Sequence, residues 1–229
     1  MASKNKLARF AEMETFENTF QPSLNDIMDA DFRFRGRWNE YFENDNPIVL
    51  ELGCGKGEYT IGLAKMCPEK NFIGIDIKGA RIWKGAKQGE EEQLKNACFI
   101  RTKIDFVSRF FGANEVDEIW CTFSDPQPKK PNKRLTSRIF INRYRSFLKK
   151  EGVIHLKTDS DLLFESTEEQ ISEFNYNELF KTWDLYGEGI DGLSDDEKSI
   201  LEIKTFYEKM WLKEGKRIKY VKFQIDQDD

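Results

Sequence analysis

The chain has 229 residues, enough for one α/β domain with an appended segment and too few for two comfortable domains. Hydrophobic residues make up 39% and charged residues 34%, and the formal net charge of -5 argues against a protein that coats nucleic acids unselectively. No apolar run approaches the roughly 20 residues that span a bilayer, and four scattered cysteines with one histidine make a zinc site unexpected. We therefore expect a cytoplasmic protein with free thiols, no bound metal and no membrane contact.

Residues 1–45 are charged and aromatic without a clean period, which predicts a basic and aromatic N-terminal extension to a domain at 46–229. Short apolar strands and helical stretches then alternate. The strands are predicted at 48–52, 71–76, 97–102, 118–123, 152–158, 178–185 and 217–225. The helices are predicted at 58–66, 79–95, 106–111, 136–149, 162–174 and 204–212. This rhythm predicts an α/β fold with a Rossmann-like, doubly wound, mostly parallel seven-stranded sheet whose last strand is antiparallel.

The first predicted strand ends in Glu51, and glycines follow at Gly53, Gly55 and Gly57. A strand, a glycine-rich turn and a helix are typical of a cradle for a nucleotide-type cofactor, because glycines let a ligand lie against the backbone. The spacing is tighter than in the dinucleotide fingerprint, and the acid suits a cationic amine better than phosphates. S-adenosylmethionine carries an ammonium, a sulfonium and no phosphate. A purely structural glycine turn is the alternative.

Two further acids follow the next two predicted strands. Asp76 ends its strand, where a carboxylate can accept hydrogen bonds from both ribose hydroxyls of an adenosine. Asp105 comes just after the third strand, where an acid can accept from the exocyclic amine of adenine. A helix N-cap is the structural alternative for each of them.

The most specific motif is the segment 123–134, which we call the Asp125 loop. The fourth strand delivers Asp125 at its carboxyl end, where ligands bind in such sheets, and three prolines stiffen the exit. Four cations follow within six residues: Lys129, Lys130, Lys133 and Arg134. A fixed acid beside a rigid basic loop favours a base carried on a phosphate backbone, and a solvated basic loop is the alternative.

With these motifs in place, the chain resembles the bacterial tRNA (guanine-N7-)-methyltransferase family from about residue 47 to residue 223. The matching stretches are 51–57, 74–76, 124–134, 155–159 and 205–208. One departure is Gln127, which stands where family members usually carry a Trp, so a stacking role at this position is not expected. The lone histidine, His155, lies inside a predicted strand, and we interpret it as a packed residue rather than a catalytic base.

The resemblance implies methyl transfer from S-adenosylmethionine to N7 of guanine 46, in the variable loop of tRNA, with S-adenosylhomocysteine as the product. The implied donor-binding residues are Glu51, Gly53, Gly55, Asp76, Asp105 and Asp125. The implied substrate-binding residues are Lys129, Asp159, Thr205, Phe206, Tyr207 and Glu208. Asp125 is the implied catalytic residue, although Asp125 and Asp159 are both candidates for the guanine edge. The implied partner is tRNA, with no obligatory protein partner and a monomer or homodimer as the assembly.

Three other functions compete with this interpretation, and one of them, methylation of a protein or a small molecule, leaves the basic loop unexplained. A nicotinamide-dependent oxidoreductase would use a similar glycine turn, but the tight spacing and the lack of a paired Tyr/Lys or His site for hydride transfer disfavour it. A non-enzymatic RNA-binding module would explain the basic loop, yet it would have no use for acids at every strand end.

Overall fold

The computed structural model describes residues 2–29, 32–187, 189–190 and 192–225. The chain divides into two compact units, at residues 1–112 and 113–229. The predicted α/β class with mostly parallel pairing is confirmed, and the described residues form eight strands where seven were predicted, four in each unit. Within these described ranges, no helix has the length and apolar character needed to cross a membrane.

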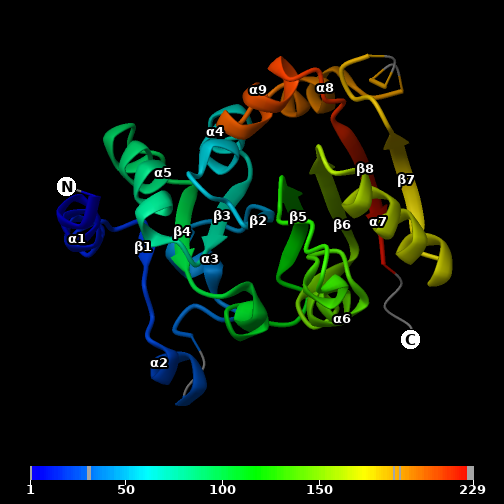
Figure 1. Ribbon diagram of the computed structural model, residues 1–229. Coiled ribbons are helices and arrows are strands. Elements are labelled where there is room, and N and C mark those ends of the chain that lie inside the picture. Colours follow the sequence, from blue (N-terminus) through cyan, green and yellow to red (C-terminus); the bar gives the residue numbers. More distant parts are fainter. Residues whose placement is uncertain (1, 30–31, 188, 191, 226–229) are drawn as a thin grey trace. The chain divides into compact units, whose positions relative to one another are not determined.

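The first unit alternates strands and helices along the chain (Figure 1). Its strands are β1 (Thr19–Phe20), β2 (Ile48–Leu52), β3 (Asn71–Asp76) and β4 (Ala97–Arg101). Its helices are α1 (Ala2–Met13), α2 (Leu24–Asp29), α3 (Trp38–Phe42), α4 (Glu58–Met66), α5 (Gly79–Glu91) and the 3-10 helix η1 (Ile104–Arg109). The strand order is β1-β4-β3-β2, and every pair is parallel. All residues of β2 and β3 are buried, as expected for parallel strands in the centre of an α/β layer.

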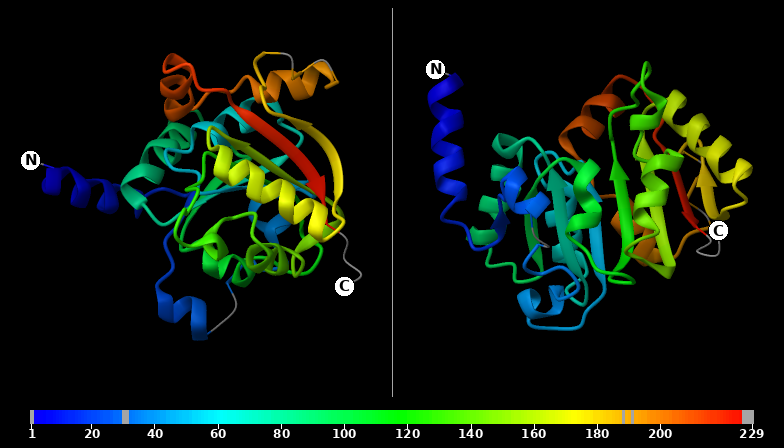
Figure 2. Two further views of the ribbon diagram at one scale, coloured as in Figure 1. Left: turned by 45° about the vertical axis from the view of Figure 1, so that its right-hand side comes forward. Right: turned by 90° about the horizontal axis from the view of Figure 1, so that it is seen from below.

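The described part of the predicted N-terminal extension is built into this unit. Strand β1 pairs with β4, and α1 packs against α5 (Figure 2). Glu12 of α1 accepts a hydrogen bond from the Trp83 indole of α5 at 2.7 Å. Trp38 is fully buried, and its indole N–H donates to the Phe110 carbonyl at 2.9 Å. These segments therefore complete the edge of the sheet, while a domain boundary at residue 45 stays a prediction.

The second unit holds the remaining strands, in the order β5-β6-β8-β7. Its strands are β5 (Val116–Thr122), β6 (Leu148–Thr158), β7 (Asn177–Thr182) and β8 (Lys219–Gln224). Its helices are η2 (Pro131–Lys133), α6 (Arg138–Tyr144), α7 (Asp161–Glu173), α8 (Asp195–Leu201) and α9 (Phe206–Lys213). Strands β5 and β6 are parallel, whereas β8 is antiparallel to both of its neighbours, which confirms the predicted antiparallel last strand.

Three predicted helices differ clearly from the observed ones, and the first of them, predicted at 79–95, ends at Glu91 as α5. The helix predicted at 136–149 ends at Tyr144, because Leu148 already pairs with Val116 as the first residue of β6. The Phe147 carbonyl accepts backbone hydrogen bonds from both Glu115 and Val116, which pulls this stretch into the sheet. The helix predicted at 106–111 is the short 3-10 helix η1.

Candidate active site

The glycine turn after β2 is built from left-handed backbone. Gly53, Gly55 and Gly57 have φ angles of 81°, 56° and 69°. A Cβ on Gly57 would lie 2.6 Å from the Phe99 ring, so packing alone requires glycine there. A Cβ on Gly55 would meet nothing nearer than the Gly53 carbonyl oxygen at 3.9 Å. The backbone at Gly55 therefore borders open space, which fits a ligand lying against it.

Asp76 holds this turn in place. Its Oδ2 accepts a hydrogen bond from the Gly55 N–H at 2.9 Å, and its Oδ1 accepts from the Lys78 N–H at 2.8 Å. Lys78 is the N-cap of α5, so the carboxylate supports the start of this helix and the glycine turn together. Each carboxylate oxygen has a second lone pair, which leaves acceptor capacity for a ligand hydroxyl.

Glu51 is engaged at the start of α4. The carboxylate is 4% exposed, and its Oε2 accepts hydrogen bonds from the N–H (2.9 Å) and the hydroxyl of Thr60. The N-cap of α4 is Gly57, which has no side chain to satisfy the first N–H groups of the helix. Glu51 therefore does part of the capping from the neighbouring strand, an interaction that its position in the sequence does not reveal.

Cys54 lies inside the glycine turn. It is buried, and burial raises the pKa of its thiol, with the nearby Glu51 and Asp76 carboxylates acting in the same direction. A thiol that stays protonated is a poor nucleophile, so we interpret Cys54 as a residue that packs the turn.

Asp105 stands in the first turn of η1, after β4, and is half-buried. The N-cap of η1 is Lys103, so the N-cap alternative for Asp105 is wrong. Since β2, β3 and β4 are adjacent and parallel, Glu51, Asp76 and Asp105 lie at the same edge of the first unit's sheet, where these strands end. We call these three acids with Gly53 and Gly55 the glycine-loop site. In the part of the chain that the structure describes, no group of His, Cys, Asp and Glu is arranged to hold a metal ion.

The Asp125 loop leaves β5 with two non-glycine residues in left-handed backbone, Phe123 (φ 50°) and Gln127 (φ 46°). The Phe123 N–H donates to the Lys157 carbonyl of β6 at 2.8 Å, which fixes the start of the loop. The Asp125 side chain is exposed, and its Oδ1 accepts a hydrogen bond from the Gln127 N–H at 2.9 Å. Strained backbone of this kind is common where a fold presents a functional side chain.

The four cations of the loop divide into two groups. Lys129, Lys130 and Lys133 are exposed, in keeping with contacts to phosphates. Arg134 is only 7% exposed, and its Nε donates to the Pro126 carbonyl at 2.9 Å. The expectation that Arg134 holds a phosphate is therefore wrong, because the buried guanidinium braces the loop from beneath.

Asp159 follows β6, the parallel neighbour of β5. Its Oδ2 lies 3.2 Å from the Lys216 ammonium, and its backbone carbonyl accepts from Lys219 at 3.0 Å. Asp159 and Pro126, the residue after Asp125, line one hollow of about 460 Å³. Two of the predicted substrate motifs therefore meet inside the second unit.

The predicted substrate stretch 205–208 forms the N-terminus of α9. Thr205 and Glu208 make a reciprocal capping box, each side chain accepting from the other residue's backbone N–H at 3.2 Å. Phe206 and Tyr207 are 52% and 39% exposed, with ring centroids 5.6 Å apart. Glu208 is fully buried. Its direct contact with substrate stays a prediction, and in this structure its carboxylate serves the fold.

The reason for the burial of Glu208 is Lys157, a residue that the sequence reading did not single out. The Lys157 ammonium is fully buried and lies 2.8 Å from Glu208 Oε1, which also accepts from the Tyr186 hydroxyl. The Lys157 ammonium also donates to the backbone carbonyls of Leu201 (2.7 Å) and Ile203 (3.2 Å). Burial lowers the pKa of Lys157 to about 8, against the opposing effect of Glu208. The signal that could have revealed this network is the Thr-x-x-Glu capping-box pattern at 205–208.

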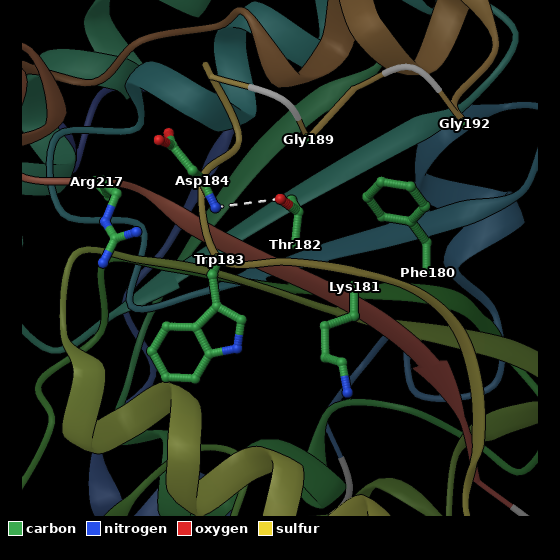
Figure 3. A pocket seen from close by; sticks show the side chains of 8 residues that line it. All are labelled: Phe180, Lys181, Thr182, Trp183, Asp184, Gly189, Gly192 and Arg217. Atoms are coloured by element: carbon green, nitrogen blue, oxygen red, sulfur yellow. Dashed lines mark hydrogen bonds between the residues drawn. The ribbon is translucent and has the colours of Figure 1, made fainter.

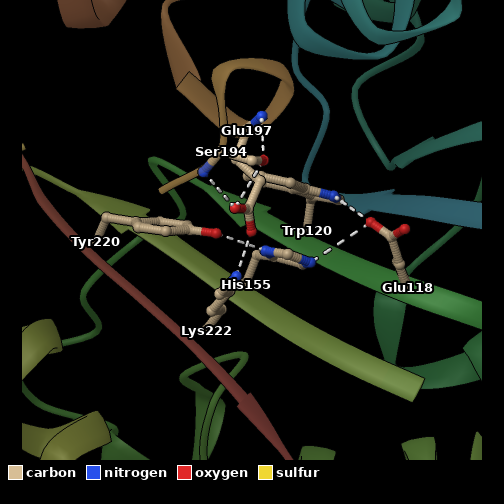
Figure 4. Close-up of polar contacts among 7 residues, drawn as sticks. All are labelled: Glu118, Trp120, His155, Ser194, Glu197, Tyr220 and Lys222. Carbon is tan, nitrogen blue, oxygen red and sulfur yellow. Dashed lines mark hydrogen bonds and ion pairs between the residues drawn. The ribbon is translucent and has the colours of Figure 1, made fainter. Parts of the chain in front are cut away.

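His155 is confirmed as a packed residue (Figure 4). Its ring lies 3.9 Å from the Trp120 ring in a parallel stack, and its Nδ1 is 2.8 Å from the Tyr220 hydroxyl. Its Nε2 is 3.4 Å from Glu118 Oε2. The buried ring thus lies among neighbours on β5 and β8, in keeping with a packing role.

Comparison with known proteins defines the class first. The fold is that of methyltransferases: the crystal structure of the 16S rRNA methyltransferase KamB aligns with a TM-score of 0.62 over 83% of this chain and 93% of that one, at 11% sequence identity. A family model described as "Putative methyltransferase" matches residues 45–221, which include parts of both units.

Close relatives then give the family. A tRNA (guanine-N(7)-)-methyltransferase of Bacteroides thetaiotaomicron is 50% identical over 98% of this chain and 87% of its own length. The protein of the same name from Christiangramia forsetii is 49% identical over 98% of this chain and its own full length. The chain belongs to the tRNA (guanine-N(7)-)-methyltransferase family.

Proposed function

We propose that this protein transfers a methyl group from S-adenosylmethionine to N7 of a guanine in tRNA, guanine 46 of the variable loop. The observation that carries the proposal is the Asp125 loop, where an exposed carboxylate at the end of β5 stands beside the exposed cations Lys129 and Lys130. Sequence relatives at about 50% identity that carry the name of this reaction support it.

The glycine-loop site suits the donor. Open space borders Gly55, and the carboxylates of Glu51, Asp76 and Asp105 stand at the carboxyl ends of three adjacent strands, an arrangement that favours a cationic ligand over a pyrophosphate. Asp76 would accept from the ribose hydroxyls, and Asp105 from the adenine amine. Glu51 would face the ammonium group while it caps α4. When bound, S-adenosylmethionine supplies a methyl group on a positively charged sulfur.

The reaction needs little acid–base chemistry from the protein. Guanine N7 has an in-plane lone pair and no proton, so its electrons form the new N–C bond while the C–S pair returns to sulfur. The guanine ring gains a positive charge, which a carboxylate such as that of Asp125 stabilises as the charge develops. Alignment supplies most of the remaining rate enhancement. The packed state of His155 and the buried, protonated thiol of Cys54 are consistent with this chemistry.

RNA binding is assigned to exposed groups of the second unit. The exposed Lys129, Lys130 and Lys133 would contact phosphates, and the half-buried Asp159 would accept from the Watson–Crick edge of the guanine. The exposed rings of Phe206 and Tyr207 offer faces for unstacked bases, which is how proteins commonly hold single-stranded RNA. A cytoplasmic protein that needs no metal and no protein partner, as a monomer or homodimer, completes the proposal.

The test is to incubate the protein with methyl-labelled donor and unmodified tRNA, then digest the RNA to nucleosides. The expected result is label in 7-methylguanosine, strongly reduced with the variant Asp125→Ala. Label in another nucleoside would reject the proposed target. Binding of a nicotinamide dinucleotide in preference to S-adenosylmethionine would reject the proposed class of donor.

A further inference from the structure

Two hollows in the second unit share one wall. The first, of about 460 Å³, is lined by Pro126, Asp159, Lys216, Arg217 and Lys219. The second, of about 450 Å³, is lined by Phe180, Lys181, Trp183, Asp184 and Arg217 (Figure 3). Each volume lies within the range of about 300–1,000 Å³ that is usual for small-molecule sites. Arg217 is the cation that the two hollows have in common.

The other cations around the hollows are already occupied. Lys216 pairs with Asp159 and lies 3.6 Å from the Trp211 ring centroid, and Lys219 pairs with Asp161. Lys181 pairs with both Glu168 (3.2 Å) and Glu178 (3.1 Å).

Arg217, in contrast, is exposed and makes no side-chain hydrogen bond or ion pair with any other residue that the structure describes. The carboxylate of Asp184, on the wall of the second hollow, accepts a hydrogen bond from the Gly187 N–H at 3.1 Å. A guanidinium without a described partner, on the ridge between two hollows, is therefore available to an anion from outside the chain.

The chemistry of the ridge fits a phosphodiester. A guanidinium presents a flat fork of N–H donors that matches two phosphate oxygens, and it remains charged at any physiological pH. The first hollow contains Asp159, which the proposed function assigns to the target guanine. The second hollow offers the aromatic ring of Phe180, whereas the Trp183 indole points to the other side of the strand and packs edge-to-face on Phe164 (Figure 3). Aromatic faces stack on bases irrespective of sequence.

We infer that Arg217 binds the phosphodiester joining the target guanine to its neighbour, and that the hollow beside the Phe180 ring receives the neighbouring base. The inference rests on the proposed function, since it places the guanine beside Asp159. It adds a second nucleotide subsite and a residue that holds the RNA backbone between the two.

The first experiment compares Arg217→Gln with Lys150→Gln, which removes the same charge from an exposed residue at the opposite end of β6 from Asp159. Arg217→Gln is expected to weaken tRNA binding about 10-fold and to raise KM for tRNA with kcat nearly unchanged. The slope of log affinity against log salt should become shallower by roughly 0.7 to 0.9, as for one lost phosphate contact. Lys150→Gln is expected to change affinity less than twofold. Equal affinities and salt slopes for Arg217→Gln and the wild type would overturn the inference.

The second experiment tests the neighbouring base. Phe180→Leu is expected to weaken the binding of a guanine-containing oligoribonucleotide about 5-fold or more, because the neighbouring base loses its stacking partner. Equal affinities of Phe180→Leu and the wild type would show that the neighbouring base does not lie in the second hollow. Arg217→Lys is expected to recover part of the affinity, because it restores the charge without the fork.

The nucleoside digest of the wild-type reaction separates the two hypotheses. If 7-methylguanosine forms and Arg217→Gln behaves as the wild type, the proposed function stands and the inference fails. If no 7-methylguanosine forms, the proposed function fails, and the subsite loses its assigned guanine with it. Because Arg217 is exposed, an unchanged thermal midpoint is expected for its variants, and this confirms that they fold.

Discussion

The glycine-loop site and the Asp125 loop use their acids in opposite ways. Glu51 and Asp76 are at most 9% exposed, and both bind the protein's own backbone at helix starts and at the glycine turn. Asp125 and Lys129 are exposed, and the one hydrogen bond of Asp125 that the structure gives is local to its loop. The two acids proposed for the donor are therefore part of the fold, whereas Asp125 and Lys129, proposed for the substrate, are displayed on it. Substitutions in the two regions should separate in their effects on stability and on turnover.

The largest effect is expected in a buried residue behind the substrate stretch. Lys157→Met leaves the Glu208 carboxylate buried without its ammonium partner and should lower the free energy of unfolding by about 3–5 kcal/mol. Urea denaturation measures this loss. The matched control is Lys149→Met, also on β6, which breaks a partly exposed ion pair with Asp117 and should cost less than about 1 kcal/mol. Similar losses in free energy of unfolding for the two variants would show that the buried pair stabilises the fold no more than the partly exposed pair.

Asp125→Ala should reduce kcat by about 100- to 1,000-fold, because the developing charge on guanine loses its carboxylate. The side chain is exposed, so the urea midpoint should remain that of the wild type. Steady-state methylation of tRNA and a denaturation curve test both statements. Near-normal turnover would show that another group, with Asp159 as the first candidate, performs this role.

Asp76→Asn should combine the two kinds of effect. An amide in this place can accept one backbone N–H, where the carboxylate accepts from both Gly55 and Lys78. We expect a loss of about 1–3 kcal/mol in unfolding free energy together with about 10-fold weaker donor binding by calorimetry. The control Asp125→Asn should leave unfolding unchanged. Full stability in Asp76→Asn would contradict the view that the donor acids support the fold.

Lys129→Ala should give the smallest effect, about threefold weaker tRNA binding with a shallower salt dependence. The ammonium is exposed, so no change in stability is expected. Titrations at several salt concentrations provide the measurement, and an unchanged slope would move the phosphate contact to another cation of the loop.

Residues 48–76 of the first unit match the prediction made from the sequence. Strands β2 and β3 and helix α4 have the predicted bounds, because continuous apolar runs separated by a glycine-rich turn leave few alternatives. Helix α1 and strand β1 were missed, since a polar helix and a two-residue strand carry no period of their own and depend on α5 and β4. Helix α8 was also missed, although the Ser194 capping box with Glu197 is a recognisable start signal.

The candidate site was predictable in position more than in role. Strand ends placed the acids of each unit correctly at the carboxyl edges, but one-dimensional patterns cannot tell which charged side chains are buried. Arg134 was grouped with its exposed neighbours, whereas tertiary packing sends it beneath Pro126. Lys157 was not recognised for the same reason, because its partners Leu201, Ile203 and Glu208 lie more than forty residues away along the chain.

The left-handed turn of Gly53, Gly55 and Gly57 has a kinetic consequence. Its curvature is set by the glycines and secured by the Asp76 carboxylate before any ligand arrives. The conformational entropy of this glycine-rich segment is lost once, when the chain folds, and not again in every catalytic cycle. The association rate of the proposed donor should therefore be limited by diffusional encounter and not by rearrangement of this turn.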